Sequence, residues 1–224
     1  MVGTFAHYKE KRQQYALLAS DEEREGTPEA AWYGLWNLVL YGITFTSANL
    51  LVFPQRDLLT KTGNPTAKIA RSARFPDFVI SRGRVHNGER VTEKILLITE
   101  IKPYGSNDAQ RHLNLSSARS DAEEQVLHYF SRLEAEDQAK VVTLVAAGLS
   151  WQWAVYKRAP STPAKDSGRS ASIYLKMHRG MLQLQDHPND ATLRWANPVD
   201  VDAGSQGVSP GLQDLLDYLE EDFN

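Results

Sequence analysis

The stretch Ile-Leu-Leu-Ile-Thr-Glu-Ile-Lys, residues 95–102, decides the fold of this 224-residue chain. Its first half is continuously apolar, which is typical of a buried strand, whereas its second half carries two charged residues. Successive side chains of a strand point to opposite faces, so Glu100 and Lys102 share a face. A buried strand that ends with an acid and a base on one face predicts a polar site at the end of a sheet.

A hairpin is expected to join this strand to the one before it. Residues 75–81 and 94–101 are strand-like runs, and Asn87-Gly88 lies between them. Asn-Gly is the strongest short hairpin signal, because both residues tolerate the positive φ of a type I′ turn. The two strands are therefore predicted to be antiparallel neighbours. A suitable register then brings Asp77 to the charged end of the later strand.

Two carboxylates beside one ammonium suit the hydrolysis of a phosphodiester bond. Carboxylate oxygens bind hard divalent cations, here Mg²⁺ or Mn²⁺, and the metal polarises the phosphate and activates water. The Lys102 side chain orients that water, deprotonates it as a neutral amine, or stabilises the developing charge as an ammonium. Each residue also has a plainer interpretation: Asp77 as a turn residue that starts a strand, and Glu100 with Lys102 as an exposed strand end.

Three short motifs together resemble those of a known nuclease superfamily. Pro-Asp at residues 76–77, followed by Glu-Ile-Lys at 100–102, resembles the PD-(D/E)xK motif of the restriction-endonuclease-like nucleases. Gln-Val-Leu-His-Tyr at 125–129 resembles the QxxxY element of RecB-like members. The resemblance covers about residues 27–156. It implies an α/β fold, with a central mixed β-sheet flanked by helices and a restriction-endonuclease-like core, and a metal-dependent nuclease.

The resemblance also implies a role for each matching residue. Asp77 and Glu100 are the implied metal ligands, and Lys102 is the implied catalytic base or charge stabiliser. Gln125 and Tyr129 lie four residues apart, so they share one face of a helix. Both are implied as supporting contacts that point at the metal site or the phosphate.

The family often carries a further acidic residue on a helix before the core sheet, and Glu29 is the candidate. In that interpretation Glu29 is an additional ligand of Mg²⁺ or Mn²⁺. It also lies in the first turn of a helix predicted to open at Thr27-Pro28, where an acidic residue stabilises the helix dipole. Both interpretations stay open.

Charge is distributed unevenly, although the net charge is only −3. Residues 56–94 carry nine Lys and Arg against four Asp and Glu, a net of +5, and residues 182–224 carry one against nine, a net of −8. Basic side chains that flank the site are candidates to track a nucleic-acid backbone, with solvated surface charge as the alternative. These candidates are Arg71, Arg74, Arg82, Arg84 and Arg90.

The chain is expected to form a single nuclease-like domain over residues 1–224, because its length suits one domain. A capping box at Ser120 and Glu123 is expected to open the helix that carries Gln125. The other expected elements are an N-terminal helix 4–24, a helix from residue 27, extended structure 45–53, strands 141–147 and 151–156, a mobile loop 157–170, and an acidic C-terminal helix 209–224.

Composition excludes several other classes of protein. The chain has no cysteine, so disulfide frameworks, thiolate zinc sites and cysteine nucleophiles are excluded. No apolar run reaches the roughly 18 residues of a membrane span.

The protein is expected to be intracellular, in cytoplasm or nucleus, and to act on nucleic acid, with DNA favoured over RNA. A protein partner that delivers it to its substrate is a further prediction, and the oligomeric state is left open.

Two other functions remain as alternatives. The first is a catalytically inactive module that keeps the nuclease-like fold as a nucleic-acid or protein interaction surface. The acidic tail is a candidate to occupy the basic cleft in such a module, or to gate that cleft in an active nuclease. The second is a small-molecule hydrolase with the same carboxylates, for which no sequence feature speaks. Binding of Mg²⁺ or Mn²⁺ distinguishes an enzyme from an interaction module, because a bound ligand stabilises the folded state.

Overall fold

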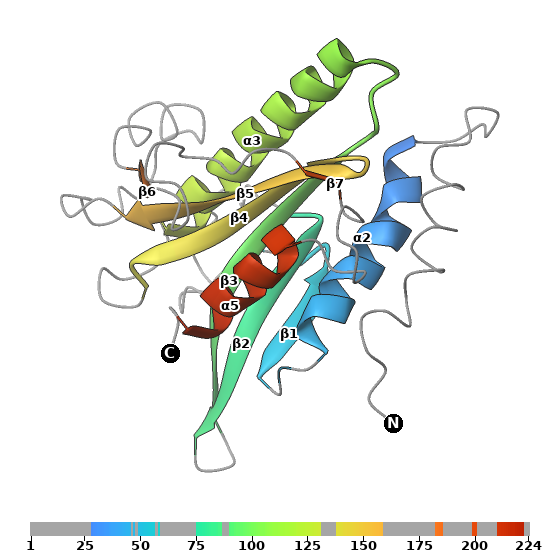
Figure 1. The fold of residues 1–224 in the computed structure, drawn as a ribbon. Helices are drawn as coiled ribbons and strands as arrows, with labels where there is room; N and C mark the ends of the chain where they lie inside the picture. Colours follow the sequence, from blue (N-terminus) through green and yellow to red (C-terminus); the bar gives the residue numbers. More distant parts are fainter. Residues whose placement is uncertain are drawn as a thin grey trace, which may run out of the picture.

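A computed structural model provides the fold (Figure 1). It describes residues 28–45, 47, 49–56, 58, 75–86, 90–130, 138–158, 182–185, 199–200 and 210–221. The predicted N-terminal helix 4–24, the Asn87-Gly88 turn, and residues 159–170 of the predicted mobile loop lie outside the described residues.

The strands form one mixed sheet in the order β1-β2-β3-β4-β5-β6, and β7 also pairs with β5. Strands β3 and β4 are parallel, and all the other pairs are antiparallel. The predicted antiparallel pairing of β2 with β3 is therefore confirmed, as is an α/β fold with a mixed sheet. The strands are β1 (Leu50–Pro54), β2 (Phe78–His86), β3 (Arg90–Lys102), β4 (Lys140–Ala147), β5 (Ser150–Arg158), β6 (Leu182–Gln185) and β7 (Val199–Asp200).

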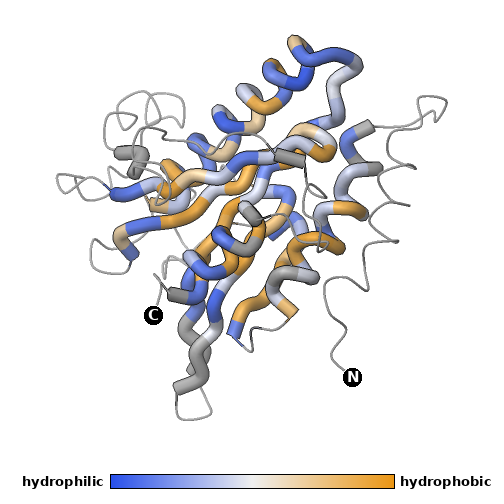
Figure 2. Tube along the Cα trace, in the orientation of Figure 1, coloured by the Kyte–Doolittle hydropathy of each residue, from blue (hydrophilic) through white to orange (hydrophobic). Residues whose placement is uncertain are grey.

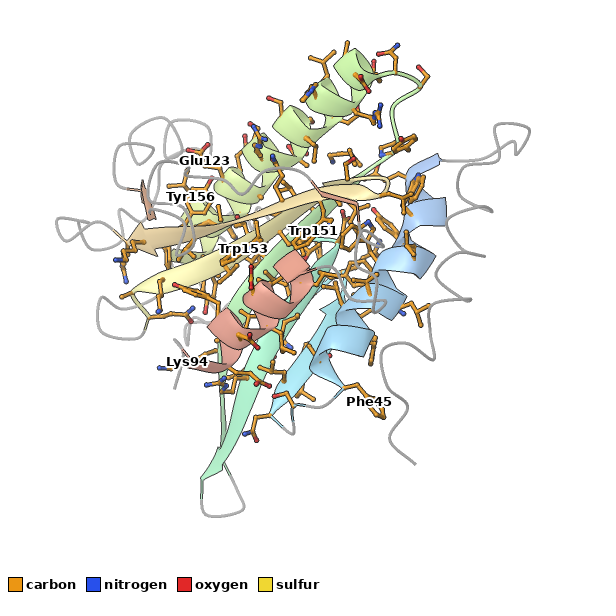
Figure 3. All side chains as sticks on the ribbon, in the orientation of Figure 1. Phe45, Lys94, Glu123, Trp151, Trp153 and Tyr156 are labelled. Carbon is orange, nitrogen blue, oxygen red and sulfur yellow. The ribbon has the colours of Figure 1, made fainter. Side chains whose placement is uncertain are left out.

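Helices cover both faces of the sheet (Figure 1). On one face, α2 (Pro28–Thr44) and α5 (Pro210–Glu221) share a buried apolar cluster with the strands. Trp151 and Trp153 project from β5 into this cluster (Figure 3), as expected for two residues that alternate on a strand. The other face is covered by α3 (Asp108–Phe130). None of the described helices has the length and apolar character of a membrane span.

Helix α3 connects the parallel strands β3 and β4, as such a crossover requires. It begins at Asp108, so the predicted start at a Ser120–Glu123 capping box is wrong. The side chain of Asn107 caps the helix, since its Oδ1 accepts the Gln110 amide at 2.9 Å. The first turns are exposed and hydrophilic (Figure 2), and their lack of an apolar stripe explains why the sequence pattern did not reveal them.

The acidic C-terminal segment forms α5, which packs into the core through its apolar side. Leu212, Leu215 and Leu219 are fully buried, and the Tyr218 ring lies 5.5 Å from that of Trp153. That the acidic tail occupies or gates a basic cleft stays a prediction. The described part of the tail is a structural helix, because its apolar stripe has the sheet as its partner.

A bulge in β3 decides which face carries the two charged residues. Ile80 pairs with Leu97, whereas Ser81 pairs with Ile95, so Leu96 is an extra residue on β3. Leu96 and Leu97 both belong to the cluster under α2 and α5. The bulge thereby reverses the alternation of side chains between the two faces of the sheet. As a result, Ile98, Glu100 and Lys102 face α3.

The turn between β4 and β5 contacts the end of β3. Gly148 has φ +61°, and a Cβ there would lie 2.3 Å from Cδ2 of Tyr104, so both the conformation and the space require glycine. The Gly148 amide donates to the carbonyl oxygen of Lys102 at 3.0 Å, and Trp36 Nε1 donates to the carbonyl of Gly148 at 3.0 Å. This turn therefore holds the last residue of β3 against α2.

Candidate active site

Asp77 lies directly before β2, and two hydrogen bonds hold its buried carboxylate against β3. The amide of Ile101 donates to Oδ2 at 2.7 Å, and the hydroxyl of Tyr33 on α2 donates to Oδ1 at 2.7 Å. Ile101 lies between Glu100 and Lys102 in the sequence, so the hairpin register does place Asp77 at the charged end of β3. Each carboxylate oxygen retains capacity for a further ligand, because it has two lone-pair sites.

Glu100 points from β3 toward α3 and is 5% exposed. The side-chain amide of Gln125 donates to its Oε1. Gln125 is also buried, and its carbonyl oxygen Oε1 has no hydrogen-bond partner among the described residues. A buried acceptor without a partner costs about 1–3 kcal/mol.

The ammonium of Lys102 lies among carboxylates from three different elements. Its Nζ is 2.9 Å from Oδ2 of Asp121 on α3, 3.7 Å from Oε2 of Glu100 and 3.7 Å from Oε1 of Glu29 on α2. Glu29 also accepts a 3.5 Å hydrogen bond from the Tyr33 hydroxyl. The first turn of α2 thus reaches the rim of the site, where Glu29 contacts both Lys102 and the tyrosine that holds Asp77.

Burial shifts the protonation of both carboxylates toward the neutral acid. Desolvation, followed by repulsion from Asp77, raises the pKa of Glu100 to about 8. Desolvation likewise raises the pKa of Asp77, although the hydrogen bonds from Ile101 and Tyr33 oppose the shift. A cation bound beside the two carboxylates would oppose both shifts, because a nearby positive charge favours the ionised form.

Lys102 remains an ammonium despite its partial burial. Desolvation lowers its pKa, but the hydrogen bond to Asp121 and the charges of Glu100, Asp121 and Glu29 outweigh that effect, so the pKa is raised. The site thus combines two carboxyl groups whose pKa values are raised with a lysine whose pKa is also raised.

The carboxylates of the site are the kind of donor that could hold Mg²⁺ or Mn²⁺. Among the described residues, no three His, Cys, Asp or Glu side chains lie close enough to hold a metal ion. Mg²⁺ is usually bound by only one or two carboxylates, together with waters and substrate phosphates. Asp77 and Glu100 supply two carboxylates. Oxygen donors alone are the chemistry that these ions prefer.

Comparison with known proteins adds no relative to this picture. No protein-family model, curated protein or solved structure matches the chain. The interpretation of the site therefore depends on its own residues and their geometry.

Tyr129 lies apart from the site, contrary to the expectation that it shares the site with Gln125. Its hydroxyl accepts from the Ile95 amide at 3.4 Å and donates to Oε1 of Gln138 at 2.8 Å. Helix α3 runs along β3, and the four residues from Gln125 to Tyr129 span about 6 Å. Tyr129 therefore contacts β3 near the bulge, whereas Gln125 contacts Glu100. Tyr129 thus holds β3 and the segment before β4 together.

Arg82 does not face solvent as a backbone contact to nucleic acid would. It is 8% exposed, and its Nη2 donates to the carbonyl of Leu219 at 2.9 Å in the last turn of α5. Its guanidinium satisfies a carbonyl at a helix C-terminus, where a cation is also favoured by the dipole. Arg84 lies on β2 opposite Thr92, and nothing is described of its side chain. Arg71 and Arg74 lie outside the described residues.

We expect Arg82→Met to lower the free energy of unfolding by about 1–3 kcal/mol, because the buried carbonyl of Leu219 loses its donor. Urea unfolding measures the change. Lys94→Met is the matched control, since Lys94 pairs with Arg82 across the hairpin but is exposed (Figure 3); its effect should stay within about 0.5 kcal/mol. Equal stabilities for the two variants would contradict the capping role, and a selective loss of nucleic-acid affinity by Arg82→Met would restore the original prediction.

Two residues at the site, Tyr33 and Asp121, were not predicted from the sequence. Tyr33 lies one turn after Glu29 on α2, and Asp121 one turn before Gln125 on α3. The spacing from Gln125 was an available signal for Asp121, since residues four apart share a helix face. A helix expected to open at Ser120 instead placed Asp121 in the first turn, where an acidic residue is explained by the helix dipole.

Proposed function

We propose that the protein is a metal-dependent nuclease that hydrolyses phosphodiester bonds of nucleic acid. The observation that carries the proposal is the convergence of Asp77, Glu100 and Lys102 at the end of the β2–β3 hairpin. The resemblance of these residues to the PD-(D/E)xK motif supports it. So does the succession of α2, the antiparallel strands β1 to β3, then α3, and then β4 parallel to β3, which suits a restriction-endonuclease-like core.

Asp77 and Glu100 would hold Mg²⁺ or Mn²⁺. When bound, the ion supplies the Lewis acidity that polarises the phosphate and activates water. The hydrogen bonds from Ile101 and Tyr33 fix the Asp77 carboxylate, and the Gln125 amide fixes that of Glu100. Partners of this kind orient ligand side chains and are about as important as the ligands themselves.

Lys102 acts as a charge stabiliser in this proposal, in preference to a base. A base must be unprotonated, and the three carboxylates around the ammonium favour the protonated form. A fixed ammonium beside the metal ligands suits the negative charge that develops on the phosphate during hydrolysis. Its position at the end of β3 is rigid, because Gly148 binds the carbonyl of Lys102.

The substrate class is tested by cleavage of labelled oligonucleotides. Purified protein is incubated with single-stranded and double-stranded DNA and RNA, each with Mg²⁺, Mn²⁺ or EDTA. We expect cleavage with either metal and none with EDTA, with DNA as the first substrate and RNA as the second. Failure to cleave all four substrates under every condition would remove the nuclease proposal.

An inactive module with the same fold is the second candidate, and one observation favours it. The Lys102 ammonium already neutralises part of the acidic cluster, and the described residues include no preformed group of three metal ligands. Such a module would use the surface around the site to bind nucleic acid or a protein without hydrolysing it.

Metal binding separates the two candidates. Mg²⁺ at about a hundred times its Kd should stabilise a metal-binding enzyme by about 2.7 kcal/mol. The measurement is the thermal unfolding midpoint of the parent and of Asp77→Asn as Mg²⁺ or Mn²⁺ is added. We expect a rise for the parent and none for Asp77→Asn, because the variant loses one ligand charge. No rise for the parent, or the same rise for both proteins, would favour the inactive module.

A further inference from the structure

The closest partner of the Lys102 ammonium is Asp121 on α3, which belongs to none of the motifs. The Asp121 oxygen lies 2.9 Å from Nζ, whereas those of Glu100 and Glu29 each lie 3.7 Å away. The lysine side chain has several rotatable bonds, so its nearest fixed partner determines where the charge rests.

The position of Asp121 follows from the way α3 crosses β3. Gln125 contacts Glu100, and Asp121, one turn earlier, contacts Lys102, two residues later on the strand. Four residues of helix advance about 6 Å, and two residues of strand advance about 6.6 Å. Helix and strand run in opposite directions, so the two spacings match. Consecutive turns of α3 thus each hold one motif residue of β3.

Loss of Asp121 would leave Lys102 with Glu100 and Glu29 as its remaining partners. An ammonium that moves onto Glu100 would neutralise a carboxylate needed by the metal and would leave the place from which it can meet the phosphate. Asp121 holds the Lys102 ammonium close to α3 and so keeps it at a distance from the Glu100 carboxylate. Exposed surface ion pairs contribute little to stability. In this pair the Asp121 side chain is 45% exposed, whereas that of Lys102 is 21% exposed and also lies 3.7 Å from Glu100.

We propose that Asp121 is a positioning residue, which acts through Lys102 to keep its ammonium beside, but not on, the metal ligand Glu100. The role rests on the proposed nuclease function, to which it adds a residue outside the PD-(D/E)xK and QxxxY motifs. Asp121 itself touches neither substrate nor metal in this role.

The test is a double-mutant cycle on cleavage, followed by one on stability. Asp121→Asn should lower kcat by about 10- to 100-fold, the range for residues that orient a catalytic group, with an unchanged KM for the oligonucleotide. Asp121→Glu should recover part of that loss. In a Lys102→Ala background, Asp121→Asn should have no further effect, because the group it positions is gone. Asp108→Asn, at the exposed start of the same helix, is the control and should cleave as the parent does.

Two results would overturn the positioning role: an unchanged kcat in Asp121→Asn, or an equal loss with and without Lys102. The second cycle measures thermal unfolding without metal, for the parent, Lys102→Ala, Asp121→Asn and the double variant. Non-additive midpoints are expected for residues in direct contact, and additive midpoints would show that the pair does not form. If the parent cleaves nothing, the nuclease proposal fails on that ground, and the unfolding cycle still decides whether Asp121 holds Lys102.

Discussion

Lys102→Ala is expected to reduce the kcat of Mg²⁺-dependent cleavage by about 10²–10³-fold, the loss typical of a charge stabiliser in a preorganised site. Lys102→Arg should retain much of the activity, because it keeps a positive charge near Asp121 and Glu100. An essential base would give a different pattern, since an arginine does not deprotonate in proteins. The measurement is single-turnover cleavage of a labelled oligonucleotide at saturating Mg²⁺.

The control for Lys102→Ala is Lys157→Ala, which removes an exposed lysine at the other end of the sheet. It should cleave as the parent does. If Lys102→Arg were as inactive as Lys102→Ala, the charge-stabiliser role would give way to a base or to a strict geometric requirement. If Lys102→Ala cleaved at the parental rate, Lys102 would have no part in catalysis.

Glu100→Gln is expected to stabilise the metal-free protein at pH 8 while removing its response to Mg²⁺. The pKa of Glu100 is raised from 4.5 to about 8 in the folded protein. Between these values the folded state binds more protons than the unfolded state, so the free energy of unfolding falls as the pH rises. Each pKa unit corresponds to about 1.4 kcal/mol, so the rise from 4.5 to about 8 corresponds to a loss on the order of 5 kcal/mol across this window.

Glutamine has no proton to lose, and the variant should therefore lack this part of the pH dependence. The measurement is urea unfolding in EDTA from pH 5 to pH 9 for the parent and Glu100→Gln, with a repeat in Mg²⁺. The metal should restore the stability of the parent at pH 8 but not that of the variant. Parallel curves for the two proteins would show that Glu100 is not the buried acid responsible.

The sequence predicted those features that depend on local pattern. The β2–β3 hairpin followed from Asn87-Gly88 between two apolar runs, and its register places Asp77 beside β3. The shared face of Glu100 and Lys102 followed from strand alternation. The bulge at Leu96 was not predictable, because a continuously apolar run gives no periodic signal. That bulge nevertheless decides that the two charges face α3.

Contacts between elements were predicted less well, because they depend on how helices cross the sheet. Gln125 and Tyr129 do share a helix face, but α3 follows β3, so only Gln125 meets Glu100. Asp121 and Tyr33 carry no motif of their own and enter the site through the placement of their helices. The position of Arg82 in a basic segment likewise gave no sign that α5 would cover its side chain.

The central claim is that Asp77, Glu100 and Lys102 form a metal-dependent nuclease site. Its most direct test is the initial rate of Mg²⁺-dependent oligonucleotide cleavage by the parent beside a Glu100→Ala, Lys102→Ala double variant whose fold is verified by circular dichroism. We expect the parent to cleave only with metal and the double variant to show no cleavage above background. Equal cleavage by the two proteins, or retained oligonucleotide binding with no cleavage by the parent, would contradict the claim.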